Sequence, residues 1–406
     1  MSKAPLRRTR GDLIATGTIA AVAVLALLIA FFTAPIRQDK LTPAAEELPN
    51  GGVLAIAPQS LQEGATLHDD SPDPRPLTVA GLIVTYDKDS RTITGSTPDG
   101  KEQWTYKRGA ELCGMAEAWD DVVAVYRTNV GCGDVVAIKA TTGQYSHTRS
   151  SVAPDEVEVI SSNDRVGTVA PSRTEIWRSD LVRTVEYGEV EAPQEPEFQP
   201  NPGCHITSAM TRTEFFALTE VCDDGAWLRM QKATPEDSRK PELYESVEIS
   251  EGSYLVAVGQ EAAAVYDPGS SQVTSFNQDG KELASSEAPQ SDLLADSPTG
   301  VANPQIADLP HHMSYYDGKN LMLLDPDTLA VTTIFADALG TGFGAGDRLV
   351  YPTAQGIAVA NWETKSIDRV IPVNRHGHTG PVSIASAGAT VVEKRGTDIA
   401  VLDLVQ

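Results

Sequence analysis

The chain has 406 residues and a formal net charge of −24, with 41% hydrophobic residues and four cysteines. A chain of this length can bury a large core, and its length alone would ordinarily indicate two or three domains. The excess of acidic residues excludes nucleic acid and anionic lipid headgroups as partners of the bulk of the surface, because both would be repelled.

Residues 13–32 form an uncharged segment behind four basic residues, Lys3, Arg7, Arg8 and Arg10. As a helix this segment would rise about 30 Å, enough to cross the hydrocarbon core of a bilayer. A cleaved signal peptide is the alternative, but its apolar region is usually only about 7 to 15 residues long. We therefore expect an uncleaved anchor. Since basic residues stay on the cytoplasmic side, residues 1–12 are predicted to be a cytoplasmic tail and the rest of the chain extracytoplasmic.

The segment that follows the helix is expected to connect it to a folded domain. Residues 33–50 are rich in Pro, Ala and charged residues without apolar periodicity, and we interpret them as a juxtamembrane linker. Residues 52–57 are predicted as a short strand, and residues 58–75, which contain three prolines, as a loop. Residues 41–406 hold 26 basic and 54 acidic residues, so the extracytoplasmic part carries most of the negative charge.

A stretch that occurs twice predicts the architecture of this domain, residues 51–406. Tyr86-Asp87 and the turn Asp-Gly-Lys-Glu at 99–102 return as Tyr266-Asp267 and the same turn at 279–282, and the offset in numbering is the same for both parts. The units between the copies are about 40 to 50 residues long, the spacing of the four-stranded blades of a β-propeller. Four blades would then separate the copies. The sequence predicts an all-β, eight-bladed propeller, with seven blades as the alternative.

The predicted blades follow one another along the chain. They occupy about 76–108, 110–149, 155–190, 203–248 and 252–287, then two units around 320–328 and 348–373, and a last unit at 380–405. The last unit has two clear strands and ends before an outer strand. Because an open strand edge invites aggregation, we predict that residues 52–57 complete this blade beside residues 399–403 and close the ring.

The four cysteines occur as two pairs, Cys113 and Cys132, then Cys204 and Cys222, with nearly equal spacings. In each pair the first cysteine precedes an apolar strand and the second follows it. Equivalent placement in two repeats predicts two local disulfides, Cys113–Cys132 and Cys204–Cys222. The extracytoplasmic location permits them. A metal site built from all four cysteines is the alternative, but the chain lacks any Cys-x-x-Cys spacing.

Most of the units contain an apolar run that ends in Asp or Asn, or that is followed by a Thr, Ser or Gly turn. These runs are at 86–87, 138–141, 177–180, 266–269, 324–327, 360–362 and 402–403. The pattern resembles the blades of pyrroloquinoline-quinone-type repeat propellers, and the whole chain resembles membrane-anchored, quinoprotein-like propeller proteins of actinobacteria. That resemblance implies a calcium-held quinone in the dehydrogenases of the family. The five tryptophans here do not share one blade position, and no residue matches the calcium or quinone ligands, so we expect no cofactor.

Two pairs of histidines are candidate metal ligands. His311 and His312 are adjacent in a polar loop, and His376 and His378 frame a glycine between two predicted blades. A His-x-His pair can bind zinc if a third ligand converges on it. A solvated loop with no metal is the alternative interpretation.

No catalytic motif is present, so the sequence favours a non-catalytic interaction or scaffold module of the cell envelope. Its expected partner is another envelope protein or a cell-wall component. Loops at 192–202, 288–311 and 374–379 are the expected contact regions because they are long and polar. The alternative is a quinone- or metal-dependent oxidoreductase or hydrolase that uses the central funnel of the propeller. The sequence does not predict the oligomeric state.

Overall fold

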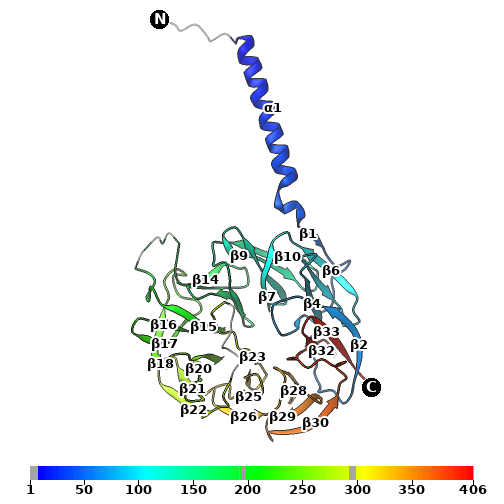
Figure 1. Cartoon of the computed structure of the whole chain (residues 1–406), viewed down its shortest axis with the longest axis vertical. Helices are drawn as coiled ribbons and strands as arrows, with labels where there is room; N and C mark the ends of the chain where they lie inside the picture. The colour runs from blue at the N-terminus through cyan, green and yellow to red at the C-terminus, as the bar shows by residue number, and fades with distance from the viewer. Residues whose placement is uncertain (1–7, 192, 194, 196, 292–298, 406) are drawn as a thin grey trace.

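Eight antiparallel sheets follow one another around a ring in the computed structural model of the chain, and a single long helix leaves the ring at its edge (Figure 1). The structure describes residues 8–191, 193, 195, 197–291 and 299–405. Neighbouring blades touch through their innermost strands, so the sheets form one closed unit. The eight-bladed, all-β prediction is confirmed.

Each blade is a meander of four strands, numbered from the centre of the ring outwards. Blade 1 has a fifth strand, β1, and the outer strand of blade 8 is β2; both are described below. Blades 1 to 4 comprise β3 (Leu77–Val79), β4 (Leu82–Asp87), β5 (Thr92–Ser96), β6 (Glu102–Lys107); β7 (Glu111–Ala118), β8 (Asp121–Thr128), β9 (Gly131–Lys139), β10 (Gln144–Ser150); β11 (Glu158–Ser161), β12 (Val166–Val169), β13 (Arg173–Trp177), β14 (Arg183–Gly188); and β15 (His205–Arg212), β16 (Phe215–Cys222), β17 (Gly225–Lys232), β18 (Leu243–Ile249). Blades 5 to 8 comprise β19 (Tyr254–Val258), β20 (Ala262–Asp267), β21 (Gln272–Asn277), β22 (Glu282–Glu287); β23 (Gln305–Asp308), β24 (Met313–Tyr316), β25 (Leu321–Leu324), β26 (Val331–Phe335); β27 (Phe343–Ala345), β28 (Arg348–Thr353), β29 (Gly356–Asn361), β30 (Ser366–Pro372); and β31 (Ser383–Ala387), β32 (Thr390–Arg395), β33 (Asp398–Leu404).

The duplicated motif lies in equivalent strands of opposite blades. Tyr86 is in β4, the second strand of blade 1, and Tyr266 is in β20, the second strand of blade 5. Both rings are buried. Asp87 and Asp267 end their strands, and the Asp267 carboxylate accepts hydrogen bonds from the turn that follows. The constant offset between the two copies therefore spans four blades, as predicted.

The ring is closed by a strand that differs from the predicted one. β2 (Leu61–His68) pairs antiparallel with β33 and supplies the fourth, outer strand of blade 8. Residues 52–57, which we predicted for this role, form no strand. They place Leu54 and Ala57 in the core between blades 7 and 8, while Val53 and Ile56 face outwards. The apolar character of this stretch therefore reflects packing, and the prediction that it closes the ring was wrong.

The predicted linker is partly built into blade 1. β1 (Lys40–Thr42) pairs with β6 and makes blade 1 a five-stranded sheet. Beyond it, the Ala44 and Leu48 amides donate to carbonyls of the turn between β9 and β10 in blade 2. Both side chains pack against the core of blades 1 and 2. Residues 33–50, predicted as a juxtamembrane linker, thus include a strand of blade 1 and contacts with blade 2.

The apolar segment forms α1 (Arg10–Thr33), which extends the predicted span by a few residues at its start. Thr9 caps the helix in a reciprocal box with Asp12, and none of the helix residues is buried against the propeller. A short 3-10 helix, η1 (Pro35–Gln38), follows. α1 is long and apolar enough to cross a membrane, or to be a signal sequence.

Both predicted disulfides are present. Cys113 of β7 is joined to Cys132 of β9 in blade 2, and Cys204, just before β15, is joined to Cys222 at the end of β16 in blade 4. The first bond joins β7 to β9 across β8, and the second joins the residue before the inner strand β15 to the neighbouring strand β16. The predicted pairing is confirmed.

Tryptophans join neighbouring blades at several points. The indole nitrogen of Trp104 in β6 donates to the Ala140 carbonyl of blade 2 at 2.8 Å. Trp177 of blade 3 lies under the Arg149 guanidinium of blade 2, and Trp362 of blade 7 lies against the hairpin of blade 6. These contacts agree with inter-blade packing, the role expected of tryptophan in propeller strands.

Candidate functional site

Polar groups of the chain itself meet at the centre of the ring, where the residues before and within β23 contact four other blades. The Glu158 carboxylate of β11 accepts hydrogen bonds from Thr299 and Asn303 at 2.8 and 3.1 Å. The Ala302 amide donates to Thr207 of blade 4. We call residues 299–308 the hub segment. It belongs to the loop 288–311 that we predicted as a contact region, and it is packed inwards; residues 292–298 lie outside the described residues.

The hub segment also contacts the blades on the other side of the centre. The Arg75 guanidinium, just before blade 1, donates to the Ile306 carbonyl at 2.5 Å. Ser383 of β31 donates to Gln305 at 3.2 Å, and Arg212 of β15 pairs with Asp308 at 3.1 Å. The hub segment is therefore bound to blades 3 and 4 on one side of the centre and to blade 8 and the start of blade 1 on the other.

One carboxyl group near the centre, that of Glu117, has a raised pKa. Glu117, near the end of β7, keeps solvent contact yet is surrounded by many protein atoms. This desolvation raises the pKa of its carboxyl group to about 7, an effect that Arg75 opposes and Asp120 reinforces. Such a group can exchange a proton near neutral pH, but a reaction would also need a nucleophile or a substrate pocket beside it.

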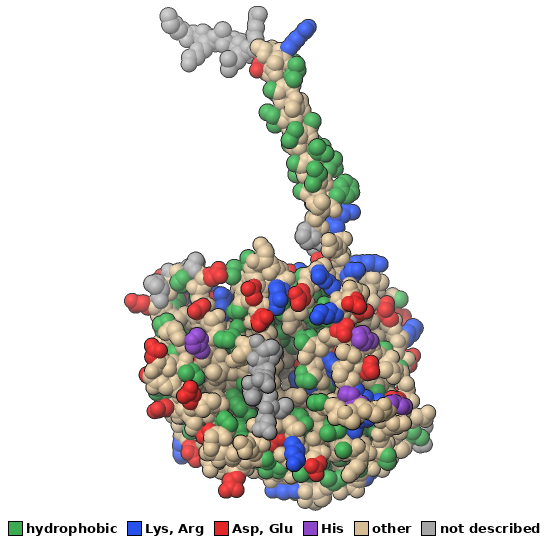
Figure 2. Space-filling view, in the orientation of Figure 1, with side chains coloured by type: hydrophobic (Ala, Val, Ile, Leu, Met, Phe, Trp, Pro, Cys, Tyr) green, Lys and Arg blue, Asp and Glu red, His purple; other side chains and the backbone are tan. Residues whose placement is uncertain are grey.

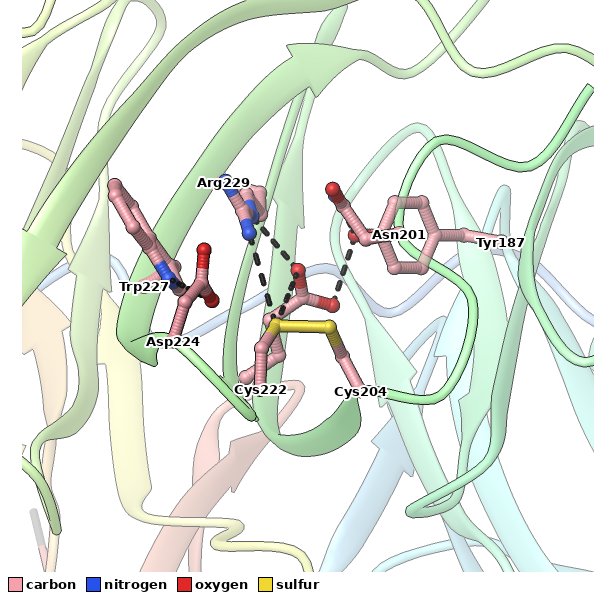
Figure 3. The surroundings of a disulfide bond; sticks show 8 residues. Tyr187, Asn201, Cys204, Cys222, Asp224, Trp227 and Arg229 are labelled. Atoms are coloured by element: carbon pink, nitrogen blue, oxygen red, sulfur yellow. Dashed lines mark hydrogen bonds and ion pairs between the residues drawn. A yellow bond between two sulfur atoms is a disulfide. The ribbon is translucent and has the colours of Figure 1, made fainter.

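A buried ion pair of blade 4, beside the second disulfide, is linked to blade 3 by a tyrosine hydroxyl (Figure 3). Glu220 of β16 is buried, and its carboxylate accepts from Arg229 Nε at 2.7 Å and from the Tyr187 hydroxyl at 2.8 Å. Asn201 donates to the Tyr187 oxygen at 2.8 Å. Figure 3 shows Tyr187 and Arg229 flanking the disulfide. Burial, and next the Glu220 carboxylate, raises the pKa of Tyr187.

This network does not form a metal site. In the described part of the chain, Cys204, Glu220 and Cys222 are the one group of three potential metal ligands whose atoms lie within 4.8 Å of one another. Both sulfur atoms are joined in the disulfide and cannot act as thiolate ligands. The arrangement instead fixes the end of β16 against blade 3.

The four candidate histidines contact other groups. His311 and His312 lie in the hairpin between β23 and β24, against the Trp362 ring, with centroids 5.6 and 5.9 Å away. His376 binds the Glu63 carboxylate of β2 at 2.7 Å, and His378 contacts the Pro381 carbonyl. None of the four belongs to a metal-sized group of His, Cys, Asp or Glu within the described residues. A zinc role for them stays a prediction.

A cluster of three arginines and two glutamates lies between blades 2 and 3. Arg173 binds both Glu175 and Glu186, Arg149 binds Glu175 at 2.7 Å, and Arg183 binds Glu186 at 2.5 Å. Burial favours the protonated form of Glu175, but Arg149 and Arg173 together lower its pKa below the usual value. Burial raises the pKa of Glu186. The five side chains carry a net positive charge, which is unusual in so acidic a chain.

Two hollows open on either side of this cluster. The first, about 440 Å³, is lined by Arg173 and Arg183 together with Phe198 and Gln199 of the predicted contact loop 192–202. Residues 192, 194 and 196 of that loop lie outside the described residues. The second hollow, about 430 Å³, lies between blades 1 and 2 and is lined by Asp39, Tyr106, Arg108, Asp134, Val136, Tyr145, Thr148, Arg149 and Ser150. Both hollows are on the rim of the ring.

The third predicted contact loop, 374–379, is anchored to blade 8. Arg375 binds both oxygens of the buried Glu393 carboxylate at 2.9 Å, and Arg395 binds the same carboxylate at 2.6 Å. Arg395 and His376 both reach Glu63 of β2. The loop thus ties the closing strand to its blade.

No protein-family model and no curated protein matches the chain. Among solved structures, it is similar to the crystal structure of BamB from Moraxella catarrhalis, with a TM-score of 0.51 and 13% identity over 84% of this chain and 99% of that chain. The two proteins share the propeller fold. The crystal structure of Saccharomyces cerevisiae Sqt1 also matches, with a TM-score of 0.49 and 11% identity over 87% of this chain and 100% of that one. At these identities the similarity concerns the fold alone.

Sequence reasoning missed the buried charges. Glu175 and Glu220 each stand between a threonine and apolar residues, in Thr-Glu-Ile-Trp and Thr-Glu-Val-Cys, within strands that are mostly buried. A charged residue inside such a run indicates a buried partner. In a chain with 56 acidic residues this indication is easily overlooked.

Proposed function

We propose that the chain is a membrane-anchored, extracytoplasmic propeller that acts as a non-catalytic interaction module of the cell envelope. The anchor is α1, with the N-terminus in the cytoplasm. The partner is an envelope protein or a cell-wall component, and the rim hollow beside Phe198, which the loop 192–202 lines, is the expected contact region.

The contacts that the hub segment makes at the centre of the ring are the observation that carries this proposal. A reaction in the funnel would need a cavity with polar groups directed at a substrate. In the described residues, polar groups of the hub segment bind polar groups of the surrounding blades, as in the pairs Glu158–Thr299 and Arg212–Asp308. The two hollows described above lie on the rim, where another macromolecule can dock.

A crosslinking experiment tests the proposal. Tagged full-length protein is crosslinked in intact cells and recovered from membranes that have been washed with carbonate. We expect retention in the membrane and the same copurified partner in repeated experiments. Phe198→Ala, in the rim hollow, should lose this partner, whereas Tyr244→Ala, on the outer strand of blade 4, should keep it.

Two outcomes would contradict the proposal. Release of an N-terminally truncated protein from the membrane would show that α1 is a cleaved signal peptide. A quinone absorbance or one metal ion per chain in the purified protein would favour the alternative, an oxidoreductase or hydrolase, to which Glu117 could contribute a proton-transfer group.

A further inference from the structure

The propeller is held close to the end of α1 by a very short connection. α1 ends at Thr33, and β1, which is already paired with blade 1, begins at Lys40. The six intervening residues can span at most about 20 Å even when fully extended, and η1 shortens them further. The chain already contacts the propeller one residue before β1, because the Asp39 carboxylate accepts a hydrogen bond from the Gly109 amide at 2.9 Å.

The chain leaves the ring at a defined edge. β1 is the outermost strand of blade 1 and lies next to the β9–β10 turn of blade 2. Figure 1 shows α1 leaving the ring next to β1, close to the labels of β6, β9 and β10. The helix then extends away from the ring in the plane of the picture. If α1 crosses a bilayer, this edge of blades 1 and 2 is the part of the propeller nearest to the lipid.

The end of α1 carries the side-chain arrangement of a membrane interface. The Arg37 guanidinium lies over the Phe31 and Phe32 rings, 4.5 and 5.3 Å from their centroids. An arginine folded over aromatic rings at the end of an apolar helix keeps its charge at the headgroup level while the rings remain in the apolar region.

Beyond Arg37, two further basic residues lie at this edge on neighbouring strands. Lys40 and Lys107 are directly opposite each other in the β1–β6 register. Like charges in such pairs repel unless an anion lies nearby. Neither lysine, nor Arg37, forms an ion pair with a carboxylate in the part of the chain that the structure describes. Figure 2 shows blue side chains gathered at the foot of the helix.

Some acidic groups at this edge already have partners. Asp39 accepts from the Gly109 amide, and Asp134 forms an ion pair with Arg108. Glu46 and Glu102 are exposed nearby. Arg37, Lys40 and Lys107 are therefore exposed cations without a carboxylate partner among the described residues, although the whole chain carries −24.

The second rim hollow opens beside these residues. Asp39 and Asp134 line it together with Arg108 and Arg149, which are paired with Asp134 and Glu175, and with the hydroxyl groups of Thr148 and Ser150. Guanidinium and hydroxyl donors are the groups that bind phosphate oxygens. The edge thus combines three cations that lack a carboxylate partner with a hollow that contains hydrogen-bond donors.

We propose that this edge binds the anionic phospholipid headgroups of the leaflet from which α1 emerges, so that the ring stands on blades 1 and 2. This inference rests on the proposed role of α1 as an anchor. Lys40 and Lys107 supply the attraction to the lipid phosphates, and the hollow between blades 1 and 2 receives a headgroup. In this orientation neither flat face of the ring lies against the membrane. The rim hollow at Phe198 therefore stays accessible to a partner.

Hydrogen exchange of the full-length protein in nanodiscs tests this inference. One set of discs contains phosphatidylcholine alone, and the other also contains phosphatidylglycerol. We expect amides of β1 and β6 to exchange more slowly in the anionic discs, and the difference to vanish at high salt. The Lys40→Glu/Lys107→Glu variant should lose the difference, because each cation removed weakens binding to the anionic surface roughly fivefold. The matched control Lys281→Glu/Lys319→Glu, on blades 5 and 6, should retain it.

The outcomes separate the two proposals. Failure of the protein to enter discs of either composition would contradict the anchor and the proposed function. Entry into both discs with identical exchange of β1 and β6 would overturn only the lipid contact. A slowing that persists in the Lys40→Glu/Lys107→Glu variant would also overturn it, provided that exchange in β8 shows the variant to be folded.

Discussion

The Asp69 carboxylate and the Lys394 ammonium group meet at 2.6 Å in the closed ring, and both side chains are buried. Asp69 follows β2, and Lys394 lies in β32 of the last blade. The same carboxylate accepts from the Tyr86 amide of blade 1 at 2.9 Å, and Lys394 also donates to the Ser71 and Asp73 carbonyls. This pair therefore connects the first blade, the closing strand and the last blade.

Removing one partner of this pair should strongly destabilise the protein. Lys394→Met leaves the Asp69 charge buried without its counter-ion, which typically costs about 3 to 5 kcal/mol of unfolding free energy. Chemical denaturation in detergent measures the loss. Lys232→Met removes a cation from an ion pair of similar length on the exposed side of blade 4, and it should cost less than about 1 kcal/mol. Equal losses of unfolding free energy in the two variants would show that the Asp69–Lys394 pair contributes no more to stability than an exposed ion pair.

Glycine at position 95 is required by the Trp104 ring. A Cβ atom on Gly95 would lie far inside van der Waals contact with the indole carbon Cε2 of Trp104, which is fixed by its bond to the Ala140 carbonyl. Gly95→Ala must displace this ring and should lower the unfolding free energy by about 1 to 3 kcal/mol. Gly269→Ala, in a turn of blade 5 where only a carboxylate oxygen lies nearby, is the control. A midpoint of denaturation unchanged in Gly95→Ala would contradict this packing.

Each disulfide should contribute to stability by itself. The two bonds join cysteines with sequence separations of 19 and 18, and for loops of this length the chain-entropy model gives about 3 kcal/mol each. The double variants Cys113→Ser/Cys132→Ser and Cys204→Ser/Cys222→Ser should therefore both show lower denaturation midpoints than the parent protein. Mass spectrometry after alkylation without reductant should find no free thiol in the parent. Labelling of the parent would disprove the bonds.

The raised pKa of Glu117, about 7, predicts a pH dependence of stability. A carboxyl group whose pKa is higher in the folded state than in the unfolded one stabilises the protein while it is protonated in both states. This contribution is lost as the pH rises from about 4 through about 7. Glu117→Gln should remove this part of the pH dependence and make the protein more stable than the parent at pH values above 7. Glu111→Gln, on the same strand, is the control, and an identical pH profile of the two variants would refute the assignment.

The blades could be predicted because their inner strands are apolar and recur with regular spacing. Runs such as those around Tyr86 and Tyr266 are buried on both faces, so composition alone identifies them. β2 escaped prediction since it contains Gln62, Glu63 and Thr66, as an outer strand with one half-buried face permits. The more apolar residues 52–57 were mistaken for it because Leu54 fills a gap between blades.

The candidate site was less accessible to sequence reasoning for a different physical reason. Hydrogen bonds between distant residues, such as Glu158 with Thr299 and Arg75 with Ile306, depend on the radius of the ring and not on any local pattern. The hub segment lies in a stretch that its composition described only as a polar loop. The disulfides, whose loops are short, were predictable since both ends of each bond fall within one repeat.

The pairing of β2 with β33 joins Leu61 to Leu404, near the two ends of the domain. A nascent chain is synthesised from its N-terminus, so β2 is made first and stays unpaired until the last blade has been made. Stalled or truncated products consequently keep two unpaired strand edges, which makes them prone to aggregation and to recognition by chaperones. Closure of the ring thereby distinguishes complete chains from incomplete ones.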